Sequence, residues 1–147
     1  MLAVPHTGMA VTIDIGKAGD IHPKNNQEVE SRLALLALAD VYKMKIPSRG
    51  PEFAKLAIKG SELELTFNHA EEGLVAQGEK LCGFVIAVAD QKWFPAVARI
   101  KRDRIVLSAT EVPEPIAVRY GWADNPECNL YNQAGLPMSP FRTDTWN

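Results

Sequence analysis

The sequence lacks the features that mark several large classes of protein. Its formal net charge at pH 7 is −2, so no excess of positive charge favours nucleic acid or an anionic membrane as a partner. No apolar run approaches the roughly 18 residues that a membrane-spanning helix needs. The N-terminus has neither a basic region nor a long apolar region, so we expect no signal peptide in it. The cellular location stays open.

Cysteine and histidine are also scarce. Cys82 and Cys128 form no Cys-x-x-Cys pair and fit no zinc spacing. They could be bridged or free, and we favour free thiols because one possible pair is weak evidence of an oxidising compartment. The three histidines are scattered and no cluster of carboxylates accompanies them. We therefore predict no metal site and no cofactor.

A nucleophile is missing as well. No serine lies in a Gly-x-Ser-x-Gly or Gly-Asp-Ser motif. The serines are Ser31, Ser48, Ser61, Ser108 and Ser139. Ser31 falls inside a predicted helix and Ser61 in a predicted hairpin turn, which are poor settings for a nucleophile. Cys82 begins a predicted strand, so we expect its side chain to pack rather than to react.

What the chain does contain is enough for one domain or two small ones, with 147 residues of which 46% are apolar. A Pro- and Gly-containing stretch at 47–51 divides it. Before that stretch, the apolar run 9–14 predicts a strand, and Asn25 or Asn26 can cap a helix that runs to about Lys43. The run Leu33–Ala39 is apolar on so many sides that we expect a sheet to cover it.

After Pro51 the pattern changes to that of short strands. The alternation at Glu62–Phe67 places Leu63, Leu65 and Phe67 on one face. Further strands are predicted at 55–59, 83–88, 94–101, 104–108 and 116–122, with turns at 60–61 and 102–103. Short strands at such regular spacing are typical of a β-sandwich, with 123–147 laid over it as an irregular tail. Trp93, Trp122 and Trp146 could stack on a sugar, although packing is their commoner role.

Asp20 and His22 are the candidate catalytic residues. They lie in a loop between the predicted strand and the predicted helix. Loops at strand ends are where α/β enzymes place catalytic groups. An aspartate that accepts the imidazole Nδ1–H fixes the tautomer, so that Nε2 can take a proton from a nucleophile. The pair therefore indicates a base and its orienting acid.

Two separate motifs, in the right order, resemble one known family. The segments MAVTIDIG, DIHPKN-Q and SRLALLALA, together with VRYGWADNPECNLYNQAGLPMSPFRTD (residues 118–144), are similar to the C-terminal part of the sialate O-acetylesterase family of SGNH hydrolases. The resemblance implies hydrolysis of acetyl esters on sugars, with His22 as the catalytic histidine. The wider superfamily spaces its pair as Asp-x-x-His. Here Gly19 occupies that position, Asp20 is one residue nearer, and Asp14 is the alternative orienter.

The fold class that this resemblance implies is α+β and mainly β. Residues 1–47 would be the last strand, Asp-His loop and helix of an SGNH α/β domain, and 48–147 an accessory antiparallel β-sandwich. The Gly-Asp-Ser and oxyanion blocks would lie upstream of Met1, so the chain reads as a C-terminal piece. The expected partner is an O-acetylated sugar, bound by the complete enzyme.

A second interpretation of the same chain is non-catalytic. It would be a β-sandwich module that binds a carbohydrate or docks to another domain. In either case the apolar run Leu33–Ala39 would lack its cover in the isolated chain. We therefore expect this helix to dock to the missing portion or to self-associate, with Leu35 and Leu38 as candidate contact residues.

Overall fold

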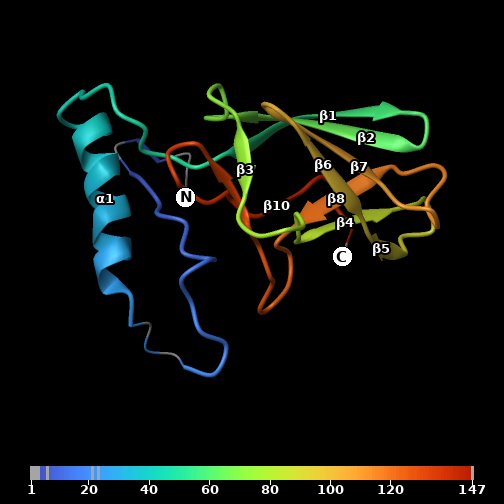
Figure 1. Ribbon diagram of the computed structural model, residues 1–147, viewed down its shortest axis with the longest axis horizontal. Coiled ribbons are helices and arrows are strands. Elements are labelled where there is room, and N and C mark those ends of the chain that lie inside the picture. Colours follow the sequence, from blue (N-terminus) through green and yellow to red (C-terminus); the bar gives the residue numbers. More distant parts are fainter. Residues whose placement is uncertain (1–3, 6, 21, 23, 147) are drawn as a thin grey trace.

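The computed structural model describes residues 4–5, 7–20, 22 and 24–146. In this part of the chain one helix, α1 (Asn26–Asp40), stands beside a set of antiparallel strands (Figure 1). The strands are β1 (Glu52–Lys59), β2 (Glu62–Asn68), β3 (Leu74–Ala76), β4 (Phe84–Ala87), β5 (Trp93–Pro95), β6 (Val97–Lys101), β7 (Arg104–Ser108), β8 (Ala117–Tyr120), β9 (Leu130–Asn132) and β10 (Phe141–Arg142). The prediction of a mainly β chain with one helix is confirmed.

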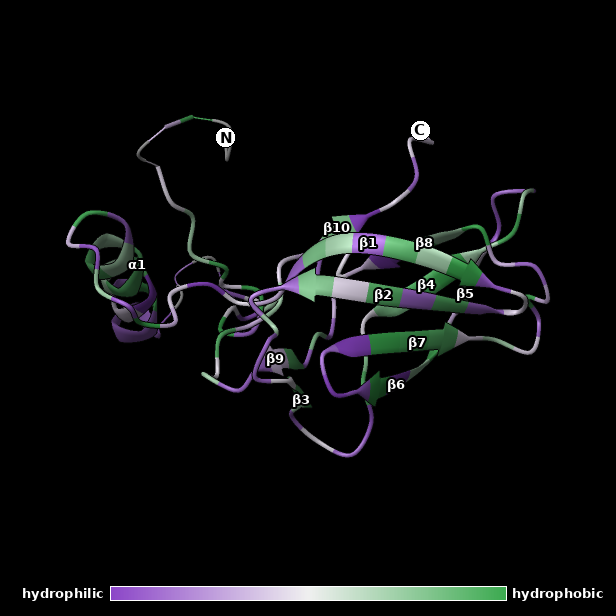
Figure 2. Cartoon of the chain, turned by 90° about the horizontal axis from the view of Figure 1, so that it is seen from above, coloured by the Kyte–Doolittle hydropathy of each residue, from purple (hydrophilic) through white to green (hydrophobic). Residues whose placement is uncertain are grey.

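The strands form two four-stranded sheets that share one core. Their orders are β1-β2-β7-β6 and β10-β8-β4-β5, and β3 pairs with β9 in a separate ribbon. Leu65 and Ile105 from the first sheet and Ile86 and Val118 from the second belong to the same cluster, each with no exposed surface. Figure 2 shows the two sheets from above, with α1 well apart from them. We call residues 51–142 the two-sheet unit.

The alternation at 62–67 sets the register of the first sheet as predicted. Leu63 and Leu65 are fully buried, and Phe67 packs against the same cluster. A shift of one residue would instead bury Glu62 and Glu64, which form ion pairs on the other face. Both predicted hairpin turns are confirmed, because Lys59 pairs with Glu62 across the first and Lys101 with Arg104 across the second.

Two predictions about the strands were wrong in detail. The single strand expected at 94–101 is two strands, because the chain leaves the second sheet after β5 and enters the first at β6. Ala96 marks the change of sheet, and its N–H donates to the carbonyl of Phe84 at 3.1 Å. The tail expected to be irregular contains β9 and β10, and β3 was also missed. Strands of two or three residues are too short to show an alternating pattern.

The strand predicted at 9–14 is absent from the structure. Among the described residues no strand precedes α1, and 13–15 form a turn in which the N–H of Ile15 donates to the carbonyl of Thr12 at 3.2 Å. A strand needs a neighbour to pair with, and no other described segment lies alongside this one as a strand. The carbonyl of Val11 accepts instead from the Arg32 guanidinium, at 2.5 Å.

Helix α1 begins where the sequence indicates and leaves part of its apolar run uncovered. The side chain of Asn25 accepts the N–H of Glu28 at 3.2 Å, which is an N-cap bond. The helix buries Arg32 and Leu36, and Leu36 lies against Gly8 of the N-terminal segment. Leu33 is 47% exposed, as expected for an apolar run that lacks its covering sheet in the isolated chain. No helix of the described residues is both long and apolar enough to span a membrane.

We predict that the isolated chain self-associates through the outer surface of α1. Leu35 and Leu38 are half-buried, whereas Leu33 and Val41 are 47% and 71% exposed, so these two define the surface. Light scattering after gel filtration should show dimers or larger species, and Leu33→Glu with Val41→Glu should shift them to monomer. Val97→Glu is the matched control, because Val97 is 62% exposed on β6. A parent protein that is a monodisperse monomer would contradict the prediction.

Candidate active site

A tight turn at Lys17–Asp20 precedes His22 and α1. The N–H of Asp20 donates to the carbonyl of Lys17 at 3.0 Å, which closes the turn. The Oδ1 of Asp20 then accepts the backbone N–H of His22 at 3.0 Å. This is an Asx-type turn, in which a side chain holds its own loop. The side chain of His22 is exposed, so a substrate or another protein segment could reach the imidazole.

The contact between Asp20 and His22 therefore involves the histidine backbone. Among the described residues, the imidazole of His22 has no hydrogen bond of its own. In this structure Asp20 fixes the path of the loop on which His22 stands. Whether its carboxylate also orients the imidazole remains a prediction, and so does the catalytic assignment of both residues.

Asp14, the alternative orienter, is fully engaged elsewhere. Its two carboxylate oxygens each accept a hydrogen bond from the Arg32 guanidinium at 2.7 Å. The hydroxyl of Tyr131 on β9 donates to Asp14 Oδ2 at 3.3 Å. Burial on its own raises the pKa of Asp14, but the hydrogen bonds and charge of Arg32 outweigh it, so the pKa lies below 3.8. Asp14 is thus an anion that anchors this region.

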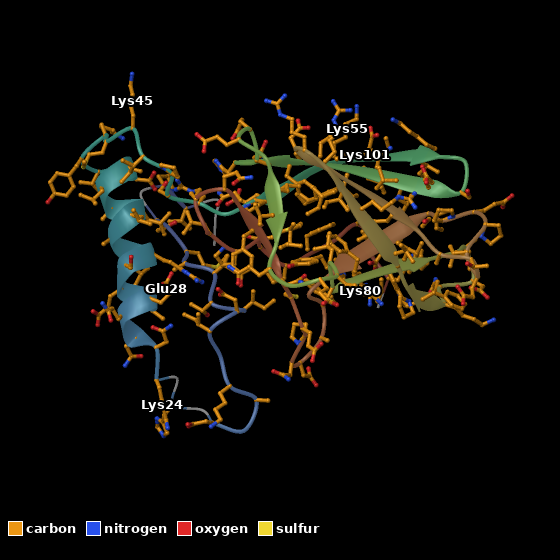
Figure 3. The ribbon with its side chains drawn as sticks, viewed as in Figure 1. Lys24, Glu28, Lys45, Lys55, Lys80 and Lys101 are labelled. Carbon is orange, nitrogen blue, oxygen red and sulfur yellow. The ribbon has the colours of Figure 1, made fainter. Side chains whose placement is uncertain are left out.

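Arg32 is the residue that sequence reasoning missed. Its side chain is only 6% exposed, and it binds Asp14, the Val11 carbonyl and, at 3.1 Å, Glu28. Figure 3 shows Glu28 on the helix side that faces the N-terminal segment. The signal in the sequence was that Arg32 directly precedes the apolar run Leu33–Ala39, because an arginine that is buried there requires an anionic partner.

The ion pair of Asp14 and Arg32 closes the loop that bears Asp20 and His22. Asp14 lies before the loop and Arg32 on the helix after it, so the pair joins the two ends. Tyr131 ties this closure to β9 of the two-sheet unit. Burial, with the nearby charge of Asp14, raises the pKa of Tyr131 to about 12, so its hydroxyl keeps the donated proton. The loop is therefore clamped at its base while its tip is exposed.

The linker between α1 and β1 is fixed by a second set of contacts. The Arg49 guanidinium binds the carboxylate of Asp40 at 2.5 and 3.1 Å. The buried side chain of Asn132 donates from Nδ2 to the carbonyl of Arg49 at 3.0 Å. A Cβ on Gly50 would lie 1.9 Å from the carbonyl oxygen of Pro137, so only glycine allows this approach. These contacts hold α1 and its loop on the two-sheet unit.

Several known proteins are similar to this chain over most of its length. No family model matches the chain. Sialate O-acetylesterase of Mus musculus is 30% identical in an alignment that covers 94% of this chain and 28% of that protein. The Homo sapiens protein is 28% identical over 94% of this chain and 29% of its own length. The crystal structure of a novel carbohydrate acetylesterase from Xanthomonas citri matches 99% of this chain, with a TM-score of 0.94 and 45% identity.

The chain is related to the sialate O-acetylesterases. The similarity extends over almost all of its residues, in sequence and in structure. The chain spans less than a third of the length of the curated relatives, and 34% of the Xanthomonas citri chain. The relatives are named as esterases, and the match covers one part of each of them.

The side chains present do not supply a nucleophile for His22. Among the described residues no serine hydroxyl is hydrogen-bonded to His22. Both cysteines are free thiols, as favoured from the sequence. Burial raises the pKa of the Cys128 thiol, which is the opposite of what a nucleophilic cysteine needs. In the described part of the chain, no cluster of three or more histidine, cysteine or acidic side chains could hold a metal ion.

Proposed function

We propose that this chain is the C-terminal portion of a carbohydrate O-acetylesterase and that His22 is its general base. The observation that carries the proposal is the match to the Xanthomonas citri carbohydrate acetylesterase over 99% of this chain. The exposed imidazole on a loop with a clamped base supports it further. Residues 1–47 would complete the SGNH-type catalytic domain, and 48–147 would be the accessory β-sandwich.

The reaction needs a serine from the remainder of the enzyme. His22 takes the serine proton as the hydroxyl attacks the acetyl carbonyl, and the resulting imidazolium protonates the departing sugar oxygen. Water then attacks the acetyl-enzyme with His22 again as base, which releases acetate and restores the serine. General-base help contributes about 10²–10⁴-fold to such a step, and only when a nucleophile is present.

Asp20 would act in this enzyme as a positioning residue. By accepting the N–H of His22 it holds the histidine backbone at the exposed tip of the loop. The clamp of Asp14 and Arg32 would hold the base of the same loop. The exposed surface of α1, with Leu33 and Val41, would pack on the sheet of the catalytic domain. The substrate class is an acetyl ester on a sugar, as the names of the relatives indicate.

The chain alone should have no esterase activity above background on an aryl acetate such as p-nitrophenyl acetate. The reason is that neither its serines nor its cysteines lie in the setting of a nucleophile. The release of nitrophenol should equal that of a His22→Ala variant. Turnover that is abolished by changing one of the serines would reveal a nucleophile within this chain. Turnover that survives His22→Ala would show that the proposed mechanism does not operate.

A further inference from the structure

Trp122 stands out among the three tryptophans because packing does not account for it. The guanidinium carbon of Arg119 lies 4.1 Å from the ring centre of Trp93. The rings of Trp93 and Trp146 have centres 5.7 Å apart. Arg119 on β8 also binds Asp144 at 2.7 and 2.8 Å. These contacts fix the C-terminal segment to β8. Trp122 takes no part in this cluster and is 51% exposed.

The indole of Trp122 is nevertheless held in place. Arg142 on β10 stacks over it, with the guanidinium carbon 5.4 Å from the ring centre. The preceding residue, Gly121, has φ +59° and donates its N–H to the carbonyl of Gly83 at 3.0 Å. A Cβ there would come within 2.9 Å of Ile13 Cδ1, so the backbone fits closely against the N-terminal segment. Arg142 covers one face of an anchored ring, and half of the side chain remains in solvent.

The surface beside Trp122 is hollowed, and the hollow continues along the N-terminal segment. One open hollow of about 350 Å³ is lined by Trp122 and Asp124. A second, of about 430 Å³, shares Gly121, Asp124 and Pro140 with it and extends along residues 9–13. That segment runs on to the Asp20–His22 loop. In Figure 1 the loop after β8 and the loop before α1 project to the same side, where Lys24 lies in Figure 3.

This combination of groups matches a sugar. A pyranose ring presents an apolar face of C–H groups and a rim of hydroxyls. An indole offers a large flat surface that loses little conformational entropy on contact. A carboxylate accepts hydroxyl hydrogen bonds, and Asp124 is exposed with no ion pair among the described residues. Small-molecule sites typically combine such an apolar wall with a few polar groups.

We propose that Trp122 and Asp124 form a binding subsite for a pyranose ring of the substrate. The ring would stack on the open face of the indole, and Asp124 would accept its hydroxyls. Arg142 would keep the indole oriented from its other face. The subsite is separate from the acetyl-transfer residues and selects the sugar rather than the ester. The proposal rests on the proposed function for the choice of a sugar as ligand.

The test is a titration of sugars into the full chain, in which NMR signals of the ¹⁵N-labelled tryptophan indoles report binding. The probes are N-acetylneuraminic acid and, separately, cellobiose as a neutral pyranose. The signal of Trp122 should move saturably with at least one of them, while those of Trp93 and Trp146 stay in place. Whichever sugar binds more tightly identifies the acidic or the neutral class. No saturable movement with either sugar would overturn the proposal.

Variants separate stacking from nonspecific contact. Saturation transfer from the protein to the bound sugar should fall about tenfold in Trp122→Ala. It should fall by a smaller factor in Asp124→Asn. Tyr42→Ala is the matched control, because Tyr42 is another exposed aromatic residue, 72% accessible and next to α1. Equal loss in Trp122→Ala and Tyr42→Ala would overturn the site. The readout is binding without turnover, so the site and the esterase mechanism can fail independently.

Discussion

Replacing His22 with alanine should reduce kcat about 10²–10⁴-fold in an enzyme completed with this chain, because the serine then lacks its base. The enzyme for this experiment is the Xanthomonas citri acetylesterase in which the matched 34% is exchanged for this chain. We call it the exchange enzyme. The high similarity of the two segments, with a TM-score of 0.94, favours correct folding. Acetate release from an acetylated sugar is the measurement.

A matched histidine variant makes this result specific. His69 lies in the loop after β2, and its carbonyl accepts from Asn132 at 3.2 Å, a bond that involves its backbone. His69→Ala should therefore leave kcat unchanged. Asp20→Asn tests the positioning role. It should lower kcat less than His22→Ala does, because an amide oxygen can still accept the His22 N–H. Full activity of the His22→Ala enzyme would assign this chain to the non-catalytic interpretation.

The second large effect is expected at the clamp of Asp14 and Arg32. Arg32→Met leaves the carboxylate of Asp14, which is 8% exposed, without its cationic partner. Breaking a buried ion pair in this way costs about 3–5 kcal/mol. Hydrogen exchange of the α1 amides, residues 26–40, should report that loss as faster opening. The double variant Arg32→Met with Asp14→Leu should recover part of the protection, because no buried charge is left unpaired.

A surface ion pair provides the control for this experiment. Lys92 and Asp90 are 2.8 Å apart, but their side chains are 73% and 49% exposed. Lys92→Ala should leave the exchange of α1 unchanged, since exposed pairs contribute little. If Arg32→Met behaves like Lys92→Ala, the clamp does not hold the loop.

The clamp should also make the stability of α1 depend on pH in a characteristic way. The pKa of Asp14 in the folded chain is below 3.8, so the unfolded chain binds its proton first as the pH falls. The stabilisation is present above about pH 4 and is lost as the pH falls through the lowered pKa. In Asp14→Asn this part of the pH dependence should disappear.

The sequence predicted those parts of the fold that depend on local pattern. The cap at Asn25, the turns at 60–61 and 102–103, and the burial of Leu63 and Leu65 each follow from a few neighbouring residues. The prediction of a strand at 9–14 was wrong because a strand needs a second strand to pair with, and the local pattern does not show whether one is present. β9 and β10 were missed because strands of two or three residues are too short to show an alternating pattern.

The residues of the candidate site also differ in how far the sequence could indicate them. Asp20 and His22 could be proposed from their spacing and from the family resemblance, since both depend on a short segment, and their catalytic roles stay a prediction. The partners of Asp14 could not, because Arg32 reaches it from the helix and Tyr131 from β9. The position of Arg32 beside an apolar run indicates that an anion lies near it, but it does not say which one.

The central claim is that this chain completes a carbohydrate acetylesterase, and acetate release by the exchange enzyme tests it most directly. The substrate would be an O-acetylated N-acetylneuraminic acid, with an acetylated neutral sugar in parallel. Our account predicts acetate release by the exchange enzyme and none by this chain alone. An exchange enzyme that is folded, as shown by a cooperative melt, but that releases no acetate from either sugar would contradict it.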